Sequence, residues 1–237
     1  MRPDGRQPDQ LRPVTLEVGF SKFAEGSCLI RQGETHMLVT ATVEDGVPRF
    51  LKGKGQGWLT SDYAMLPRSG RDRNQRDTMK PNGRSMEISR LIGRCLRTAV
   101  NLDALGERTI YIDCDALQAD GGTRCASITA GYVALAQAIH WMNEQRMLRK
   151  DPLNEPVAAV SVGVHRGTPV LDLNYAEDST AQTDMNIVLT ESGKFVEIQG
   201  TAEEDPFSFQ VMLDMIKLAK KGTDELVRLQ KEAIAGL

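Results

Sequence analysis

Hydrophobic and polar residues alternate along several short stretches of the chain, which is the pattern of half-buried β-strands. In the first half of the chain this alternation predicts strands at 14–18, 27–31, 36–43, 58–60 and 109–117. In the second half, short apolar runs on either side of glycine turns predict two hairpins, 158–165 with 169–175 and 185–190 with 195–199. Glycine-containing turns, the usual connections of hairpins, separate the paired strands.

Apolar residues at helical spacing replace the alternation in four other places. One helix follows Arg84 and carries Ile88, Leu91 and Ile92 on one face, and a long helix runs from Cys125 to about Arg146. A third helix is predicted over 206–221, with Gly222 as its C-terminal stop and Thr223 as the cap of a fourth. Strands grouped in hairpins with helices after them favour an α+β fold over a doubly wound sheet.

The two halves of the chain repeat one order of elements: a hairpin, further strands and then a helix. The second strand of each leading hairpin also ends in similar residues, Thr42-Val43-Glu44-Asp45 in one and Tyr175-Ala176-Glu177-Asp178 in the other. We therefore expect a duplicated β-α unit. A length of 237 residues accommodates one large domain or two small ones.

Composition is that of an ordinary globular protein, with 41% hydrophobic and 26% charged residues. No apolar run approaches the roughly 20 residues of a membrane span, and Met1–Arg6 lacks the apolar core of a signal peptide. We therefore expect a cytoplasmic protein without a membrane partner. The four cysteines are scattered and form no C-x-x-C pair, so we interpret them as small buried hydrophobic residues.

Charge is unevenly distributed although the net charge is only −3. Residues 49–99 contain 12 lysines and arginines against 4 acidic residues, whereas the remainder contains 17 against 28. The centre of this basic block, 67–84, has no periodicity and predicts a long flexible loop. The block is a candidate surface for a polyanion; its alternatives are a solvated loop or contacts with a partner subunit.

The segment Asp120-Gly121-Gly122-Thr123-Arg124 lies between a predicted strand and a long predicted helix. Free N–H groups and the positive dipole end at a helix start favour an anion, and glycines allow its close approach. Thr123 could cap the helix or bind the anion through its hydroxyl, and Arg124 could bind two phosphate oxygens. The alternative is a simple glycine turn followed by a surface arginine.

An acidic segment, 177–186, connects a predicted strand end to the next strand without a helical or strand pattern of its own. Its Asp178 and Asp184 could hold a hard cation such as Mg²⁺, or one could act as a general acid. The alternative is turn formation and capping. Other nucleotide motifs are excluded, because Gly53–Gly57 precedes a predicted strand and Gly193-Lys194 is followed by Phe195.

Taken together, these features resemble the ribonuclease PH family of phosphorolytic 3′→5′ exoribonucleases, which is related to polynucleotide phosphorylase and the exosome ring. The resemblance covers nearly the whole chain. The residues that carry it are Met1–Arg6, Glu44–Gly53, Gly57–Thr60, Met65–Arg68, Gly83–Ile88, Asp113–Arg124, Glu177–Ser179, Thr183–Asn186 and Glu197–Glu203.

The resemblance implies an α+β, ribonuclease PH-like single domain over 1–237, with halves 1–150 and 151–237, assembled as a homohexamer of three dimers. It implies a tRNA nucleotidyltransferase that trims tRNA precursors and other RNAs with inorganic phosphate as co-substrate. The implied phosphate-binding residues are Arg84, Gly122, Thr123 and Arg124. The implied catalytic residues, which also bind Mg²⁺ or another divalent cation, are Asp178 and Asp184. The implied RNA-binding residues are Arg68, Arg71, Arg73 and Arg76.

Two other functions compete with phosphorolysis. A non-catalytic RNA-binding ring subunit would typically lack the arginines or the aspartates, whereas this chain keeps Arg84, Arg124, Asp178 and Asp184. A hydrolytic metal-dependent nuclease would need a denser carboxylate cluster and no phosphate site. A requirement for added phosphate distinguishes phosphorolysis from hydrolysis.

Overall fold

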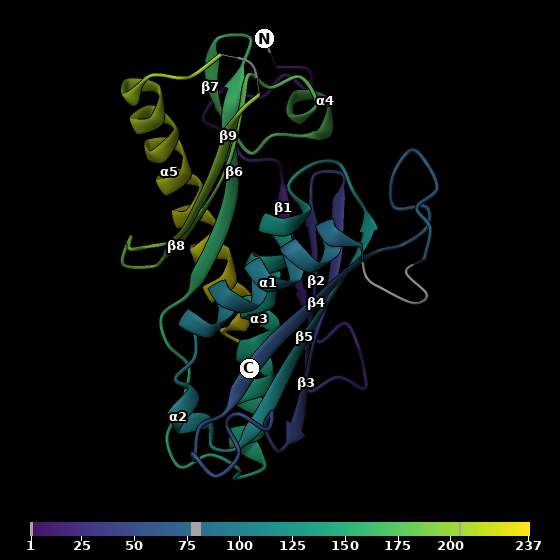
Figure 1. The fold of residues 1–237 in the computed structure, drawn as a ribbon, viewed down its shortest axis with the longest axis vertical. Helices are drawn as coiled ribbons and strands as arrows, with labels where there is room; N and C mark the ends of the chain where they lie inside the picture. The colour runs from purple at the N-terminus through teal and green to yellow at the C-terminus, as the bar shows by residue number, and fades with distance from the viewer. Residues whose placement is uncertain (1, 77–81, 204) are drawn as a thin grey trace.

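A computed structural model describes residues 2–76, 82–203 and 205–237, and it contains two β-sheets with helices between and beside them (Figure 1). The first sheet has the order β1-β2-β3-β5-β4. Neighbouring strands in it are antiparallel except for the parallel pair β4 and β5. Its strands are β1 (Val14–Val18), β2 (Gly26–Gln32), β3 (Thr35–Asp45), β4 (Trp58–Met65) and β5 (Arg108–Gln118).

The second sheet is antiparallel throughout and has the order β7-β6-β8-β9. Its strands are β6 (Val157–His165), β7 (Thr168–Leu171), β8 (Thr183–Thr190) and β9 (Phe195–Ala202). Strand β6 is buried along its whole length, because α3 packs against it from one side and α5 from the other. The predicted α+β class is confirmed by these two mixed layers of strands and helices.

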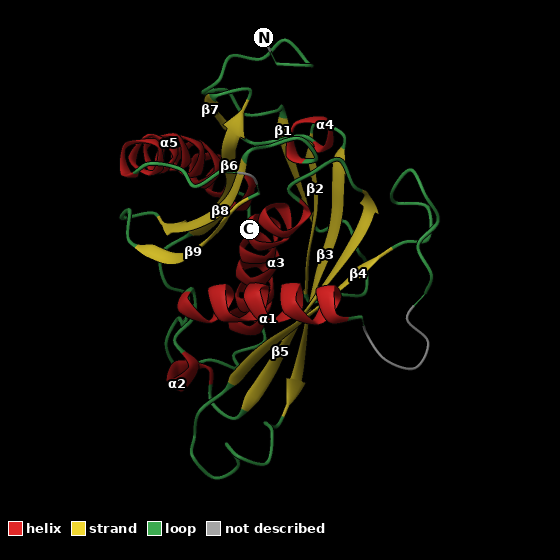
Figure 2. Cartoon of the chain, turned by 45° about the horizontal axis from the view of Figure 1, so that its top comes forward, coloured by secondary structure: helices red, strands yellow, loops and turns green. Residues whose placement is uncertain are grey.

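The helices are α1 (Gly83–Thr98), α2 (Leu102–Leu105), α3 (Thr123–Glu144), α4 (Tyr175–Asp178) and α5 (Phe209–Ile234). Helix α3 contacts strands of both sheets and is buried on nearly every face, so it forms the centre of the core. Figure 2 shows α3 between the sheets and α1 crossing in front of it. Within the described ranges, none of the helices combines the length and the apolar character that a bilayer span requires.

The prediction that the third helix stops at Gly222 is wrong, because α5 continues through it to Ile234. Gly222 is required for packing instead: a Cβ atom there would lie 2.8 Å from a methyl carbon of Leu171. Thr223 does not cap a new helix either. Its hydroxyl donates back to the carbonyl of Ala219 at 3.0 Å within the same helix.

The predicted strand over 169–175 is too long, since β7 ends at Leu171 and residues 175–178 form the helical turn α4. Asn174 and Glu177 form a capping box there, which stabilises a helix start that sequence alternation does not reveal. The similar residues at 42–45 and 175–178 therefore lie in different structures, the end of strand β3 and helix α4. The acidic segment is also more regular than predicted, because Asp184 lies on β8.

Candidate active site

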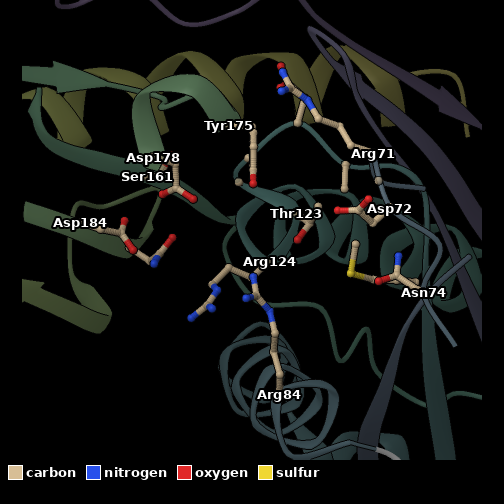
Figure 3. Close-up of a pocket in the computed structure, with 17 residues that line it drawn as sticks. Arg71, Asp72, Asn74, Arg84, Thr123, Arg124, Ser161, Tyr175, Asp178 and Asp184 are labelled. Atoms are coloured by element: carbon tan, nitrogen blue, oxygen red, sulfur yellow. The ribbon is translucent and has the colours of Figure 1, made fainter. Parts of the chain in front are cut away.

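A cleft of about 520 Å³ opens where the N-terminus of α3 faces the second sheet (Figure 3). It brings together seven of the residues predicted from the sequence: Arg71, Arg84, Gly122, Thr123, Arg124, Asp178 and Asp184. Arg68, Arg73 and Arg76 are exposed on the basic loop and do not line the cleft. Residues 77–81 of the predicted loop, with Lys80, and Met1 at the N-terminus lie outside the described residues.

Two glycines allow the chain to turn from β5 into α3 beside the cleft. Gly121 and Gly122 both have left-handed backbone conformations, with φ of 78° and 71°. A Cβ atom on Gly121 would lie 2.7 Å from the carbonyl oxygen of Leu173, so only glycine fits there. Gly122 is the N-cap of α3 and provides no capping side chain, which leaves the positive end of this 22-residue helix directed at the cleft.

Thr123 is the first residue of α3 and not its cap. Its hydroxyl lies 2.9 Å from the hydroxyl of Tyr63, in β4 beneath the cleft. Burial raises the pKa of the Tyr63 phenol, so the phenol stays protonated at neutral pH. This contact fixes the Thr123 hydroxyl at the cleft wall, where it can still bind an anion.

Arg84 and Arg124 enter the cleft from two different helices and point toward the same region (Figure 3). Arg124 donates to the side-chain oxygen of Gln199 at 2.8 Å and lies 3.5 Å from a carboxylate oxygen of Glu87. Gln199 in turn donates to Glu87 at 3.0 Å. These contacts hold the Arg124 guanidinium in place, while Arg84 is exposed at the start of α1. The pair therefore forms a cationic wall suited to a phosphate group.

Asp178 and Asp184 line the opposite side of the cleft (Figure 3). Asp178 is the last residue of α4, and Asp184 lies on β8 opposite Gly163. Burial in the cleft wall and the negative charge of Asp178 raise the pKa of Asp184 to about 6, although Arg124 opposes this shift. Burial also raises the pKa of Asp178. One of these carboxyls can therefore carry a proton near neutral pH.

The two carboxylates also fit a hard divalent cation. Mg²⁺ is usually bound by one or two carboxylates together with phosphate oxygens and water, and this cleft offers carboxylates opposite the cationic wall. A cation would offset the burial of both carboxylates and the repulsion from Asp178 that helps to raise the pKa of Asp184. Among the described residues there is no group of three or more histidine, cysteine or acidic side chains arranged around one metal position. Two carboxylates alone would complete only part of a cation's coordination shell.

Sequence patterns do not identify several cleft residues, including Ser161, Tyr175 and Asn186. Ser161 and Asn186 belong to strands whose largely apolar sequences predict only core packing. Tyr175 is half exposed, and the Arg71 guanidinium carbon lies 5.5 Å from the centre of its ring. This contact brings the basic loop to the mouth of the cleft. An aromatic residue two positions before Glu177-Asp178 was the available signal for this position.

The other reactive side chains belong to the core or to other surfaces. All four cysteines are buried, as predicted, and burial raises the pKa of each thiol. None of the three histidines lines the cleft; His165 is buried in β6, and His140 lies 3.6 Å from Glu144 on α3. The described residues of the cleft therefore carry arginine and carboxylate chemistry, without a cysteine or histidine nucleophile.

Known proteins share both the sequence and the fold of this chain. Residues 10–139 match domain 1 of the 3′ exoribonuclease family, and residues 155–222 match its domain 2. Ribonuclease PH of Methylobacterium nodulans is 56% identical over 236 residues, which cover 99% of this chain and 100% of that protein.

Two solved structures share the fold at low sequence identity. Rice (Oryza sativa) Rrp46 has a TM-score of 0.79 at 19% identity, covering 97% of this chain and 98% of that one. A chain of the Archaeoglobus fulgidus exosome with RNA bound to the active site has a TM-score of 0.78 at 22% identity, covering 96% and 91%. From its two matched domains and its full-length similarity to a ribonuclease PH, the chain belongs to the 3′ exoribonuclease family, in the ribonuclease PH branch.

Proposed function

We propose that this chain is a tRNA nucleotidyltransferase that shortens RNA from its 3′ end by phosphorolysis, with tRNA precursors as substrates. The observation that carries this proposal is the composition of the cleft: two arginines and a helix N-terminus form one wall, and two aspartates form the other. The 56% identity to ribonuclease PH of M. nodulans supports the same proposal. A purely hydrolytic enzyme would not need an anion site for a phosphate nucleophile in addition to the contacts of the scissile phosphate.

The cationic wall binds inorganic phosphate and positions it as the nucleophile. Phosphate and the RNA backbone repel each other, and Arg84, Arg124 and the α3 N-terminus offset that repulsion. A phosphate oxygen attacks the phosphorus of the terminal phosphodiester, and the bond to the preceding ribose O3′ breaks. The products are a nucleoside 5′-diphosphate and an RNA shortened by one nucleotide. The reverse reaction adds nucleotides from diphosphates.

The carboxylate wall serves the leaving O3′ oxygen. With its pKa raised to about 6, Asp184 is suited to protonate that oxygen as a general acid. Asp178 and Asp184 would hold a divalent cation such as Mg²⁺, which would neutralise charge on the phosphoryl oxygens. A proton on Asp184 and a cation on the same carboxylate exclude each other, so either one relieves the burial and repulsion of these charges.

The basic loop supports an extended RNA contact outside the cleft. Arg68, Arg71, Arg73 and Arg76 are all exposed, and Arg71 reaches the cleft mouth. In our proposal these residues bind the phosphates of the tRNA body, while the 3′ end enters the cleft. Such contacts position the substrate and carry little sequence preference.

We further propose a single domain over 1–237, a cytoplasmic location and a homohexamer built from three dimers. Exposed apolar side chains at Met86, Phe195 and Ile198 support subunit contacts. Continuous packing of α3 against both sheets supports the single domain. Light scattering at several protein concentrations measures the stoichiometry.

The reaction is tested with a tRNA carrying a 3′ extension, incubated with Mg²⁺ in the presence and absence of inorganic phosphate. We expect nucleoside diphosphates, detected by chromatography, and only when phosphate is added. Monophosphates released without phosphate would identify a hydrolase. Retained RNA binding without any product would identify a non-catalytic RNA-binding subunit.

Replacing Arg73 and Arg76 together by alanine is expected to weaken tRNA binding and to reduce the salt dependence of log K by roughly 1.5–2, one to each lost phosphate contact. The turnover rate at saturating RNA should change little, because neither side chain lines the cleft. Fluorescence anisotropy across a salt series measures both quantities. Arg149 and Lys150, exposed after α3, give the matched control, and an equal loss in that double variant would contradict a specific loop contact.

A further inference from the structure

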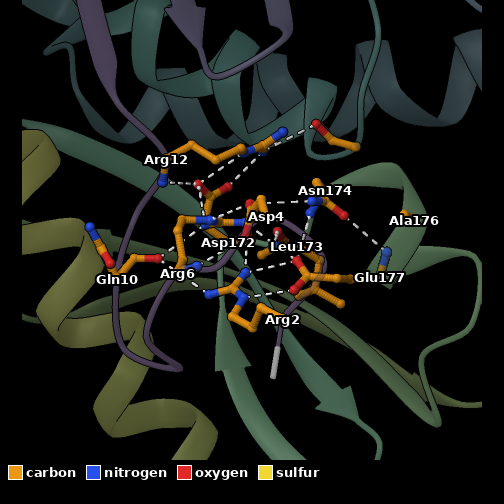
Figure 4. A network of polar contacts seen from close by, with 12 residues as sticks. Arg2, Asp4, Arg6, Gln10, Arg12, Asp172, Leu173, Asn174, Ala176 and Glu177 are labelled. Atoms are coloured by element: carbon orange, nitrogen blue, oxygen red, sulfur yellow. Dashed lines mark hydrogen bonds and ion pairs between the residues drawn. The ribbon is translucent and has the colours of Figure 1, made fainter.

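The N-terminal arm, residues 2–12, lies against the back of the cleft and carries three buried arginines. The side chains of Arg2, Arg6 and Arg12 are only 3%, 7% and 4% exposed. Arginine is rarely buried unless it is paired, and Figure 4 shows these three among acidic and carbonyl oxygens from the 172–177 segment. The arm therefore makes specific polar contacts with elements far away in the sequence.

Arg2 holds the short helix that ends in Asp178. Its guanidinium donates to both carboxylate oxygens of Glu177, at 2.6 and 2.8 Å, and to the carbonyl of Asp172 at 2.9 Å. Glu177 is fully buried and also accepts from the backbone N–H of Asn174 at 3.1 Å. Helix α4 has only four residues and is too short to be stable by itself. The orientation of Asp178 thus depends on the Arg2–Glu177 pair.

Arg12 holds the glycine loop from behind. It donates to the two carboxylate oxygens of Asp172 at 2.7 and 3.0 Å, and to the carbonyl of Asp120 at 2.6 Å. A further contact to the carbonyl of Gly121 measures 3.3 Å. The same guanidinium lies 3.1 Å from the position that a Cβ atom on Gly122 would occupy. Arg12 therefore supports the loop that leads into the N-terminus of α3.

Both arginines lie outside the cleft and contact its elements only from behind. Their partners are a capping carboxylate, a buried aspartate and the carbonyls of the glycine loop, none of which can react with RNA or phosphate. A buried ion pair contributes little net stability compared with a well-packed apolar pair, but it fixes the relative position of the groups it joins. The two arginines are therefore suited to fix the positions of the cleft elements that they contact.

We propose that the arm positions both walls of the cleft: Arg2 acts chiefly on the carboxylate wall through Glu177, and Arg12 acts chiefly on the cationic wall through the Asp120–Gly121 carbonyls. Both are positioning residues. The inference rests on the proposed phosphorolytic function and adds a division of labour to it. A displacement of about 1 Å in a reacting group costs on the order of 10²-fold in rate, so loss of either contact is measurable.

The test compares Arg2→Ala and Arg12→Ala in the full-length protein, with Arg31→Ala as control, because Arg31 forms an exposed pair with Glu17. Diphosphate release from 3′-extended tRNA is measured over a range of phosphate concentrations. We expect Arg2→Ala to lower kcat about 10–100-fold with the KM for phosphate within about twofold. We expect Arg12→Ala to raise the KM for phosphate about 10-fold. Added guanidinium should restore kcat in Arg2→Ala.

A second measurement does not depend on turnover. Amide hydrogen exchange should accelerate over 175–178 in Arg2→Ala and over 120–124 in Arg12→Ala, and equilibrium phosphate binding should weaken only in Arg12→Ala. If Arg2→Ala does not fold, Arg2→Lys and Glu177→Gln take its place, because each keeps a hydrogen bond while removing the bidentate ion pair, and both should lower kcat by a smaller factor. If Arg12→Ala does not fold, Arg12→Lys takes its place and should raise the KM for phosphate by a smaller factor.

Two results would overturn the inference. One is folded variants whose kcat, KM and local exchange match those of Arg31→Ala. The other is a pair of variants with the same kinetic defect, since that denies separate control of the walls. Failure of the proposed function looks different, because the wild-type protein itself would release no diphosphate. The hydrogen-exchange and phosphate-binding results would then still test whether the arm positions the two walls.

Discussion

Replacing Arg124 by alanine is expected to lower phosphorolysis by roughly 10³-fold, because its guanidinium holds the nucleophile against the repulsion of the RNA backbone. The fold should survive. The side chain is 20% exposed, and its partners Gln199 and Glu87 remain hydrogen-bonded to each other after its removal. Diphosphate release over a range of phosphate concentrations is the measurement, and both a higher KM and a lower kcat are expected.

The control for this variant is Arg228→Ala, which removes an exposed arginine whose partner is Glu232 on the same helix face. Its activity should equal that of the wild type. Unchanged activity in Arg124→Ala, with the far-ultraviolet spectrum and melting temperature also unchanged, would show that phosphate does not bind at the α3 N-terminus.

The strands and the central helix follow from local patterns because burial alone determines them. The segment Val157–His165 is buried on both faces, and its nearly continuous apolar run predicts a strand without any tertiary information. The end of α5 could not be predicted in this way. Gly222 is a stop signal by itself, and only its close contact with Leu171 explains why a glycine lies inside the helix.

The site is partly predictable because its chemistry lies at the ends of predicted elements. Arg124 follows a strand-to-helix turn, so the direction of its helix dipole could be inferred from the sequence alone. The relation between Asp178 and Asp184 could not, because it depends on a one-turn helix held by Arg2 from the other end of the chain. Gln199 and Ser161 lie in strands, where their polar groups give no periodic signal.

Replacing Asp184 by asparagine is expected to lower phosphorolysis by roughly 10²–10⁴-fold, since the amide cannot donate a proton to the leaving oxygen and binds a cation poorly. RNA binding should stay near the wild-type value, because the basic loop is unaffected. Product release and RNA anisotropy measured on the same preparation separate the two effects. An equal loss of RNA binding and of the phosphorolysis rate would argue that Asp184 has a structural role.

The same substitution should make the protein more stable at pH 8 in the absence of divalent cations. Burial and the charge of Asp178 raise the pKa of Asp184 from 3.8 to about 6, so the folded state binds more protons than the unfolded state between these values. Stability therefore falls as the pH rises from about 4 to above 6, and Asp184→Asn removes that loss. Allowing for solvent screening at this partly exposed side chain, the gain at pH 8 is about 1 kcal/mol.

Thermal or urea unfolding of both proteins at pH 5 and pH 8, with a chelator present, measures this gain, which should be largest at pH 8. Asp214→Asn is the matched control: hydrogen bonds from Lys217 and Gln210 lower the pKa of Asp214, so its loss should bring no stabilisation. If Asp184→Asn were less stable than the wild type at pH 8, neighbouring positive charges would outweigh the burial and repulsion of the Asp184 carboxylate. A more stable but inactive variant would show that the cleft keeps two repelling carboxylates because catalysis requires them.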